Sequence, residues 1–126
     1  MFDKMKLLVV DDMAVMRRIV SGLLCDIGFS KDNISMAVDG RDAIEKLSSQ
    51  DFDFVVTDWN MPNVTGIDLL KHIRTTEKTK SVPVLMVTAE VKKEQIIEAA
   101  KAGVNDYIAK PFDKATLAKK VNKIFS

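Results

Sequence analysis

The sequence predicts an α/β domain built as a three-layer sandwich, with helices on both faces of a parallel five-stranded sheet. Five short runs rich in β-branched and aliphatic residues alternate with five stretches whose apolar residues recur at helical spacing. No linker, low-complexity tract or internal repeat interrupts this alternation over the 126 residues. Strand-helix alternation with short connections produces right-handed βαβ units and an open parallel sheet. We expect one domain, residues 1–126, without an attached effector domain.

Five runs are predicted to form the strands, and the most apolar of them are expected at the centre of the sheet. A parallel strand that is covered on both faces needs continuous rather than alternating apolarity. The first, third and fourth runs meet this requirement, so the second and fifth are expected nearer the edges. In chain order the runs are KLLVV at 6–10, ISMAV at 34–38, FDFVVT at 52–57, VPVLMVT at 82–88 and DYIA at 106–109.

The stretches between the runs are predicted to form amphipathic helices. In the first stretch Val15, Ile19, Leu23 and Ile27 form a stripe at four-residue intervals, and Gly28 follows as a helix stop. The other helices are marked by apolar residues at similar spacing. The further marker residues are Met16, Val20 and Leu24 beside the stripe; Ala43, Ile44 and Leu47; Leu69, Leu70 and Ile73; Ile96, Ile97 and Ala100; and Leu117, Val121, Ile124 and Phe125.

The composition argues against several classes of function. Lys and Arg total 19 against 18 for Asp and Glu, so the formal charge of +1 provides no large basic field for nucleic acid or anionic lipid. The single cysteine excludes an internal disulfide and fits a reducing compartment. The first apolar run is too short for a signal-peptide core or a membrane span. We therefore expect a cytoplasmic, soluble protein that binds no nucleic acid and does not insert into membranes.

Charged and hydroxyl side chains stand where four predicted strands end. Asp11 and Asp12 follow the first strand, Asp58 the third and Lys110 the fifth, while Thr88 ends the fourth. Sites in such sheets lie outside the carboxyl ends of the strands, so these side chains should meet if the first and third strands are neighbours. Two carboxylates about 4 Å apart repel by roughly 4 kcal/mol at an effective dielectric constant near 20, so three of them need a cation. Oxygen ligands without His or Cys favour a hard ion, and a partial carboxylate set suits Mg²⁺.

Each of these residues also has a purely structural interpretation. Asp12 could cap the first helix, Asp58 could cap a turn before Pro62, Thr88 is a β-branched residue in a strand and Lys110 could be solvated. Paired charges are often only structural. Neither capping nor strand propensity, however, requires these side chains to share the carboxyl ends of four strands. Their common position therefore favours a functional site.

Four motifs make the sequence resemble the receiver domain of two-component response regulators. They are LLVVDD, TDWNMPNVTG, VLMVTAE and YIAKPF, and in this order they cover essentially the whole chain. The segments DWNMP, VPVLMVTAE, KKEQII and KPF are most similar to single-domain chemotaxis receivers. The resemblance implies a flavodoxin-like (βα)5 fold with sheet order 2-1-3-4-5, and this order rests on the resemblance rather than on the spacing of the runs.

The resemblance also implies roles in phosphoryl transfer. Asp58 is then the phosphoacceptor, Lys110 pairs with the phosphoryl group and Thr88 donates a hydrogen bond to it. Asn60 and Glu90 flank the path of the water that later attacks the acyl phosphate, and they tune its lifetime. The donor is a phosphohistidine on a separate histidine kinase, and a phosphatase is a further expected partner. Such a chain catalyses only its own phosphorylation and dephosphorylation, by charge neutralisation and positioning.

The metal ligands implied by the resemblance overlap with these residues. Asp12 and Asp58 bind Mg²⁺ through their carboxylates, and the backbone carbonyl of Asn60 is the third protein ligand. Asp11 contributes through water. The expected cofactor is therefore Mg²⁺, in agreement with the interpretation of the acidic strand ends.

The resemblance places an output face on the fourth helix, fifth strand and fifth helix. Its residues here include Lys92, Lys93, Tyr107 and Lys120. Thr88 shifts toward the phosphoryl group and leaves space that Tyr107 can occupy, so phosphorylation biases a pre-existing two-state equilibrium. The expected partner of the monomer is an acidic, amphipathic segment of a flagellar motor switch protein.

Three residues of this face depart from the chemotaxis pattern. Val91 stands where a smaller alanine is usual, Ala109 where a valine is usual and Asp113 where a neutral hydroxyl is usual. Asp113 is also a good N-cap for the fifth helix. Its negative charge opposes an acidic partner, so a receiver that acts as a phosphate sink or signals to a non-motor partner stays open as the alternative.

Two enzyme or cofactor classes fit less well. A phosphatase with an aspartyl-phosphate intermediate usually carries an acid two positions after its nucleophile, and that position is Asn60 here. A nucleotide or flavin binder needs a glycine-rich phosphate cradle after the first strand, where this chain has DDMAVM.

Overall fold

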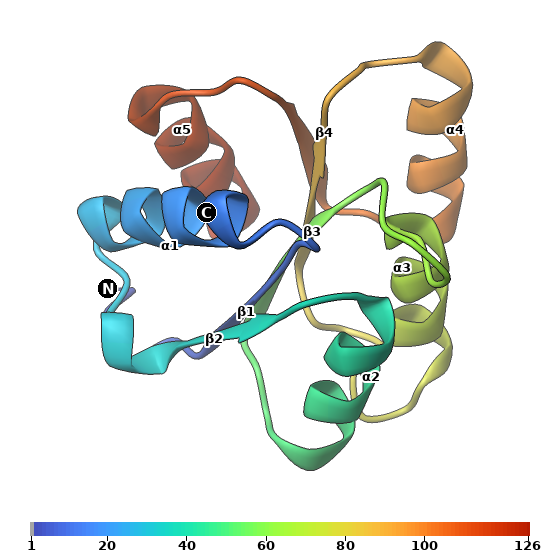
Figure 1. Cartoon of the computed structure of the whole chain (residues 1–126), viewed down its shortest axis with the longest axis horizontal. Helices are drawn as coiled ribbons and strands as arrows, with labels where there is room; N and C mark the ends of the chain where they lie inside the picture. The colour runs from blue at the N-terminus through green and yellow to red at the C-terminus, as the bar shows by residue number, and fades with distance from the viewer. Residues whose placement is uncertain (1) are drawn as a thin grey trace.

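The sheet contains five parallel strands in a computed structural model that describes residues 2–126. These strands are β1 (Leu7–Val10), β2 (Ile34–Ala37), β3 (Phe54–Asp58), β4 (Val84–Thr88) and β5 (Asp106–Ala109). Their order is β2-β1-β3-β4-β5, which confirms the flavodoxin-like order expected from the resemblance (Figure 1). Every residue of β1, β3 and β4 is buried, whereas the edge strands β2 and β5 are partly exposed, as their apolarity predicted.

Five α-helices within the same residues cover the two faces of the sheet. They are α1 (Ala14–Ile27), α2 (Gly40–Ser49), α3 (Gly66–Thr75), α4 (Lys93–Ala102) and α5 (Lys114–Ile124), and a short 3₁₀ helix, η1 (Lys31–Asn33), precedes β2. Figure 1 shows α1 and α5 on one face and α2, α3 and α4 on the other. This arrangement confirms the predicted three-layer sandwich. None of these helices is long and apolar enough to cross a membrane.

Two apolar cores lie on opposite faces of the sheet because successive strand residues point to opposite sides. In β1, Leu7 and Val9 face the core beneath α1 and α5, whereas Leu8 and Val10 face the core beneath the other helices. All four side chains are at most 1% exposed. Burial of this kind stabilises a fold by roughly 1.5 to 3 kcal/mol per large aliphatic side chain. The cores thereby fix the strands whose ends carry the candidate site.

The predicted apolar stripe of α1 is confirmed at Leu23 and Ile27, which pack against the core, and is wrong at its first two members, while the helix and its stop at Gly28 are confirmed. Val15 and Ile19 are 57% and 48% exposed, whereas Val20 and Leu24 are buried against the sheet. A stripe with four-residue intervals drifts by about 40° at each step of a helix with 3.6 residues per turn. Its first members therefore leave the face that contacts the sheet. Gly28 ends the helix with φ of 131°, a value that favours glycine.

Candidate functional site

Three carboxylates gather at the carboxyl edge of the central strands. β1 pairs with β3 so that Val10 lies opposite Thr57, and the next residues, Asp11 and Asp58, emerge side by side. With Asp12, each offers an oxygen within 4.8 Å of the others. Asp11 and Asp58 are buried and Asp12 is exposed. The parallel register therefore brings together the three acids that the strand ends suggested.

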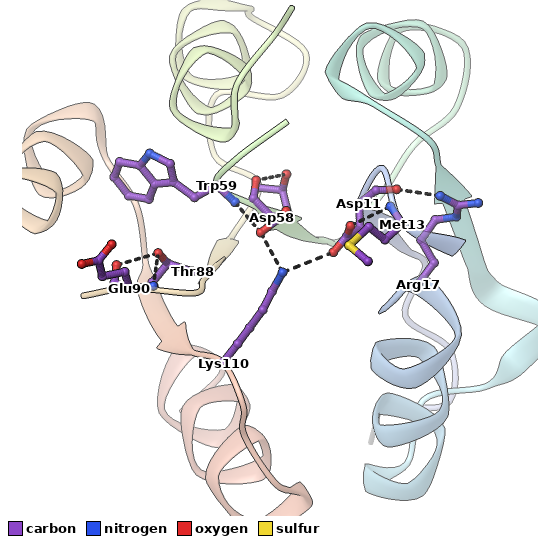
Figure 2. Close-up of polar contacts among 9 residues, drawn as sticks. Asp11, Met13, Arg17, Asp58, Trp59, Thr88, Glu90 and Lys110 are labelled. Carbon is purple, nitrogen blue, oxygen red and sulfur yellow. Dashed lines mark hydrogen bonds and ion pairs between the residues drawn. The ribbon is translucent and has the colours of Figure 1, made fainter. Parts of the chain in front are cut away.

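Lys110 reaches this acidic cluster from the end of β5. Its Nζ lies 3.1 Å from Asp58 Oδ1 and 3.7 Å from Asp11 Oδ2, and Figure 2 shows the extended side chain pointing at both acids. The backbone amide of Lys110 donates to the Thr88 carbonyl at 2.7 Å, which continues the β4–β5 pairing past the strand. The peptide bond from Lys110 to Pro111 is cis. One ammonium thus faces a group of three carboxylates.

Burial shapes the electrostatics of the two inner acids. Desolvation is the largest cause that raises the pKa of Asp58 above its ordinary value, and Lys110 opposes it. The pKa of Asp11 is also raised, first by burial and further by the charge of Asp58, while a hydrogen bond from the Met13 amide at 2.9 Å lowers it. The fold therefore holds two carboxylates where their charged forms are disfavoured. A further cation would relieve this cost.

The donor set fits a hard divalent ion such as Mg²⁺. The three acids offer carboxylate oxygens alone, without a histidine or cysteine in the cluster. Mg²⁺ is bound in proteins by one or two carboxylates together with waters and phosphate oxygens. The exposed side of the cluster, at Asp12, leaves access for those remaining ligands. Asn60 is exposed two residues beyond Asp58, on the loop that leaves β3.

Thr88 and Glu90 lie on the other side of Lys110, at the end of β4. The Thr88 hydroxyl donates to the Glu90 carbonyl at 2.8 Å, so it is directed toward the loop rather than toward Asp58 (Figure 2). The Glu90 side chain is exposed and lies 3.5 Å from Lys92. In this structure Thr88 is thus bonded within its own loop. A hydrogen bond to a group on Asp58 requires its side chain to change partner.

Two positioning contacts were missed in the sequence. The Arg17 guanidinium donates to the Asp11 carbonyl at 2.7 Å and ties α1 to the end of β1 (Figure 2). Gly66 begins α3 so close to β3 that an added Cβ would collide with the Asp58 carbonyl and come within 2.8 Å of the Trp59 Cα. Its amide donates to the Trp59 carbonyl at 2.8 Å. Among the quoted motifs only the glycine of NVTG carried a signal for this close approach.

The residues of the predicted output face form a neighbouring but separate group. Tyr107 is half-buried on β5, and Lys92 and Lys93 are exposed at the start of α4. Lys120 is not free, because its Nζ lies 3.0 Å from Asp106 and 5.1 Å from the centre of the Tyr107 ring.

The three departures from the chemotaxis pattern are all exposed. Val91 precedes α4 with 47% of its surface accessible, and Ala109 ends β5. Asp113 accepts a hydrogen bond from the Thr116 amide at 2.8 Å, which confirms its role as the N-cap of α5. Its exposed side chain lines a groove of about 320 Å³, which Tyr107 and Lys120 line as well.

Comparisons with known proteins agree on one family. The family model described as "Response regulator receiver domain" matches residues 7–122. Chemotaxis protein CheY-3 of Vibrio cholerae is 62% identical over 96% of this chain and 92% of its own length, and chemotaxis protein CheY of Pseudomonas aeruginosa is 57% identical over 96% of each chain.

Solved structures with this fold are similar over nearly the whole chain. The structure of Vibrio cholerae CheY4 gives a TM-score of 0.87 at 35% identity, covering 95% of this chain and 98% of that one. The receiver domain of a Pseudomonas aeruginosa sensor histidine kinase gives 0.83 at 28% identity, covering 97% and 98%. That domain has a magnesium ion coordinated in its active site cleft.

Proposed function

The chain belongs to the response regulator receiver domain family, and on this premise we propose that it is a phosphoacceptor signalling protein of a chemotaxis two-component system. The observation that carries the proposal is the position of Asp58. Its carboxylate lies at the carboxyl edge of the sheet beside two further acids, with the Lys110 ammonium 3.1 Å away. We infer that this single receiver domain works in the cytoplasm as a monomer.

Asp58 acts in this proposal as the nucleophile. One of its carboxylate oxygens attacks the phosphorus of a phosphohistidine on a histidine kinase, the new P–O bond forms, and the P–N bond breaks. The electron pair of that bond leaves with the imidazole nitrogen, which takes a proton from solvent. Lys110 is already within ion-pair distance of Asp58, so it neutralises charge on the phosphoryl oxygens without a large movement.

Asp11, Asp12, Asp58 and the Asn60 carbonyl would hold Mg²⁺, with Asp11 acting through water. When bound, the ion supplies positive charge that offsets both the acids and the incoming phosphoryl oxygens. The dephosphorylation step is attack of water on the phosphorus, which breaks the P–O bond to Asp58 and releases inorganic phosphate. Asn60 and Glu90, both exposed, are placed to tune access of that water or of a phosphatase.

The signal leaves the site through Thr88 and Tyr107. Both side chains line one small cavity together with Trp59 and Val91. When Thr88 exchanges its bond to Glu90 for one to the phosphoryl group, its side chain vacates part of this space and Tyr107 can turn inward. The output face with Lys92, Lys93 and Lys120 then has a different shape, which a flagellar motor switch protein could recognise.

The exposed charge of Asp113 supports a second candidate for the downstream step. A carboxylate beside Tyr107 and Lys120 repels an acidic docking segment, so a phosphate sink or a receiver with a non-motor partner is the alternative. Pull-down with an acidic motor switch peptide, with and without a phosphate mimic on the receiver, separates the two. Tight binding that depends on the mimic supports the motor and eliminates the alternative.

Mass measurement tests the phosphoacceptor chemistry itself. The protein is incubated with Mg²⁺ and a small acyl-phosphate donor, and Asp58→Ala is treated in parallel. We expect the parent to gain one phosphoryl group and the variant to gain none. A parent that stays unmodified, or a variant that is modified to the same extent, would overturn the proposal.

A further inference from the structure

The side chains of Asp106, Tyr107 and Lys120 connect β5 to α5 next to the groove that Asp113 lines. Lys120 Nζ lies 3.0 Å from Asp106 Oδ1 and 5.1 Å from the centre of the Tyr107 ring. The same Asp106 oxygen accepts the backbone amide of Tyr107 at 2.8 Å. One carboxylate oxygen therefore binds both the backbone that carries the ring and the cation that lies over it.

The burial of Asp106 keeps the Lys120 ammonium in place. The Asp106 side chain is 9% exposed and that of Lys120 is 30% exposed. Within residues 2–126 the second oxygen, Asp106 Oδ2, has no hydrogen-bond partner, and the exposed Lys123 ammonium is 3.9 Å from it. A buried carboxylate that loses its cation becomes an uncompensated charge. Lys120 is therefore the main cationic partner of Asp106, and the buried Asp106 carboxylate needs this partner while it lies against α5.

Tyr107 also lines a cavity that is too small to admit its ring. Trp59, Thr88 and Ala99 line this cavity with Tyr107, and its volume is about 10 Å³. That volume is at the limit for a single water molecule. The ring can turn inward only if Thr88 or another lining residue moves, and the same rotation carries it away from Lys120. The inward and outward positions therefore compete for the contact with the ammonium.

We propose that Lys120, anchored by Asp106, is a positioning residue that holds Tyr107 outward in the unphosphorylated protein. This inference rests on the proposed function, in which inward movement of Tyr107 transmits the signal. Loss of a cation–π contact at a partly exposed site changes an equilibrium by roughly three- to tenfold. The apparent affinity of a partner that binds only the inward form changes by the same factor while that form is rare. Asp106 and Lys120 thus set how strongly the resting protein signals.

The test uses Tyr107 itself, because it is the one tyrosine of the sequence. The whole chain is labelled with 3-fluorotyrosine, and ¹⁹F spectra are recorded without a phosphoryl donor. An inward ring is shielded from solvent, so it is identified by a smaller shift between H₂O and D₂O. Lys120→Met removes the charge but keeps a flexible apolar side chain. We expect it to raise the inward fraction three- to tenfold over the parent.

Three further variants separate the proposed role of Lys120 and Asp106 from general effects on the fold. Lys120→Arg keeps a cation that can pair with Asp106 and stack on the ring, so its spectrum should match the parent. Asp106→Asn keeps the acceptor for the Tyr107 amide but loses the charge that anchors Lys120, so the inward fraction should rise. Lys119→Met removes an exposed charge from the same helix and should change nothing. Circular dichroism verifies that each variant is folded.

The result that overturns the inference is a Lys120→Met protein that folds and shows the inward fraction of the parent. An equal rise in Lys119→Met would overturn it as well, because the effect would then come from helix charge. These spectra need no phosphorylation, so they do not depend on the mass measurement that tests Asp58. If the mass shift fails and Lys120→Met raises the inward fraction, the proposed function is overturned. If the mass shift is seen and Lys120→Met has no effect, only the proposed role of Lys120 is overturned.

Discussion

Replacing Asp58 with asparagine should stabilise the metal-free protein, because it removes one of three clustered carboxylates. At an effective dielectric constant near 20, each repulsion costs about 3.5 kcal/mol across 4.8 Å, the upper limit of the separations within the cluster, and the ion pair with Lys110 at 3.1 Å contributes about 5.4 kcal/mol. The variant loses two repulsions and one attraction, which favours it by about 1.5 kcal/mol. Because Asp12 is exposed, its repulsion with Asp58 is weaker than about 3.5 kcal/mol, which reduces the stability that the variant gains. The variant also no longer buries the Asp58 charge, which increases that gain. The expected rise in melting temperature is about 5 °C.

The pH dependence of stability follows from the same cluster. Burial is the main cause that raises the pKa of Asp58 and of Asp11 above 3.8. Above pH 3.8 and up to the raised value, the native state binds more protons than the unfolded state. The free energy of unfolding therefore falls as pH rises through this window and stays lower at neutral pH. In Asp58→Asn the free energy of unfolding should fall less over this window. Only Asp11 of the two acids remains, and the charge of Asp58 no longer raises its pKa.

Urea unfolding followed by circular dichroism, in buffer with a metal chelator, measures both effects. Asp51→Asn is the matched control, since the Asp51 carboxylate is 92% exposed and only 3.6 Å from Lys78 at the surface. Its free energy of unfolding should change by less than about 0.5 kcal/mol. Equal or lower stability of Asp58→Asn relative to the parent in chelator would refute the reasoning.

Addition of Mg²⁺ should reverse the order of the two proteins. An ion at one hundred times its dissociation constant stabilises a native state by about 2.7 kcal/mol, which exceeds the advantage of about 1.5 kcal/mol that Asp58→Asn has without the ion. The parent has all three carboxylates and should gain this amount, while Asp58→Asn should gain much less. If Mg²⁺ stabilised both proteins equally, Asp58 would not be a ligand.

Three further predictions concern residues around the site and in the neighbouring helices. In Gly66→Ala the new Cβ meets the Asp58 backbone, so urea unfolding should show a loss of about 1 to 3 kcal/mol, and calorimetric titration should show weaker Mg²⁺ binding. Thr65→Ala removes the N-cap of α3 and should lower the free energy of unfolding by about 1 kcal/mol, and an unchanged value would contradict that capping role. A hydrogen bond from Lys46 is the largest cause that lowers the pKa of Asp42, so its contribution is present above pH 3.8 and is lost as pH falls further. Acid unfolding should therefore be less steep in Lys46→Met than in the parent.

The parts of the site that the sequence could predict are those placed by the parallel sheet. Asp58 ends a strand, Asp11 and Lys110 each follow one, and the carboxyl ends of parallel strands share one edge of the sheet whatever the side chains are. The same argument covers the apolar central strands and the three layers. Periodicity does not give the order of the strands in the sheet, and this order was predicted from the family resemblance.

The parts that could not be predicted depend on long-range choices of individual side chains. Whether the Thr88 hydroxyl bonds to Glu90 or faces Asp58 is decided by rotamers, and no pattern in the sequence records it. In the sequence nothing distinguishes Lys120 from the other lysines of α5. Its role depends on the packing of α5 beside Asp106, which only the structure shows. The outward Val15 of α1 was misassigned for a related reason, since periodicity alone does not say which part of an apolar stripe reaches the sheet.

The cluster at the sheet edge links stability to signalling through charge. The clustering of Asp58 with Asp11 and Asp12 that would serve cation binding also destabilises the metal-free protein, through the repulsion among the three carboxylates. The apolar strands behind it tolerate the cost because β1, β3 and β4 are buried on both faces. The acids cannot spread apart, since their backbone is fixed by the pairing of Val10 with Thr57 and by the close packing of Gly66. Relief must then come from added positive charge, and the proposed phosphorylation increases that need because a phosphoryl group carries about −1.5 to −2 charges at pH 7.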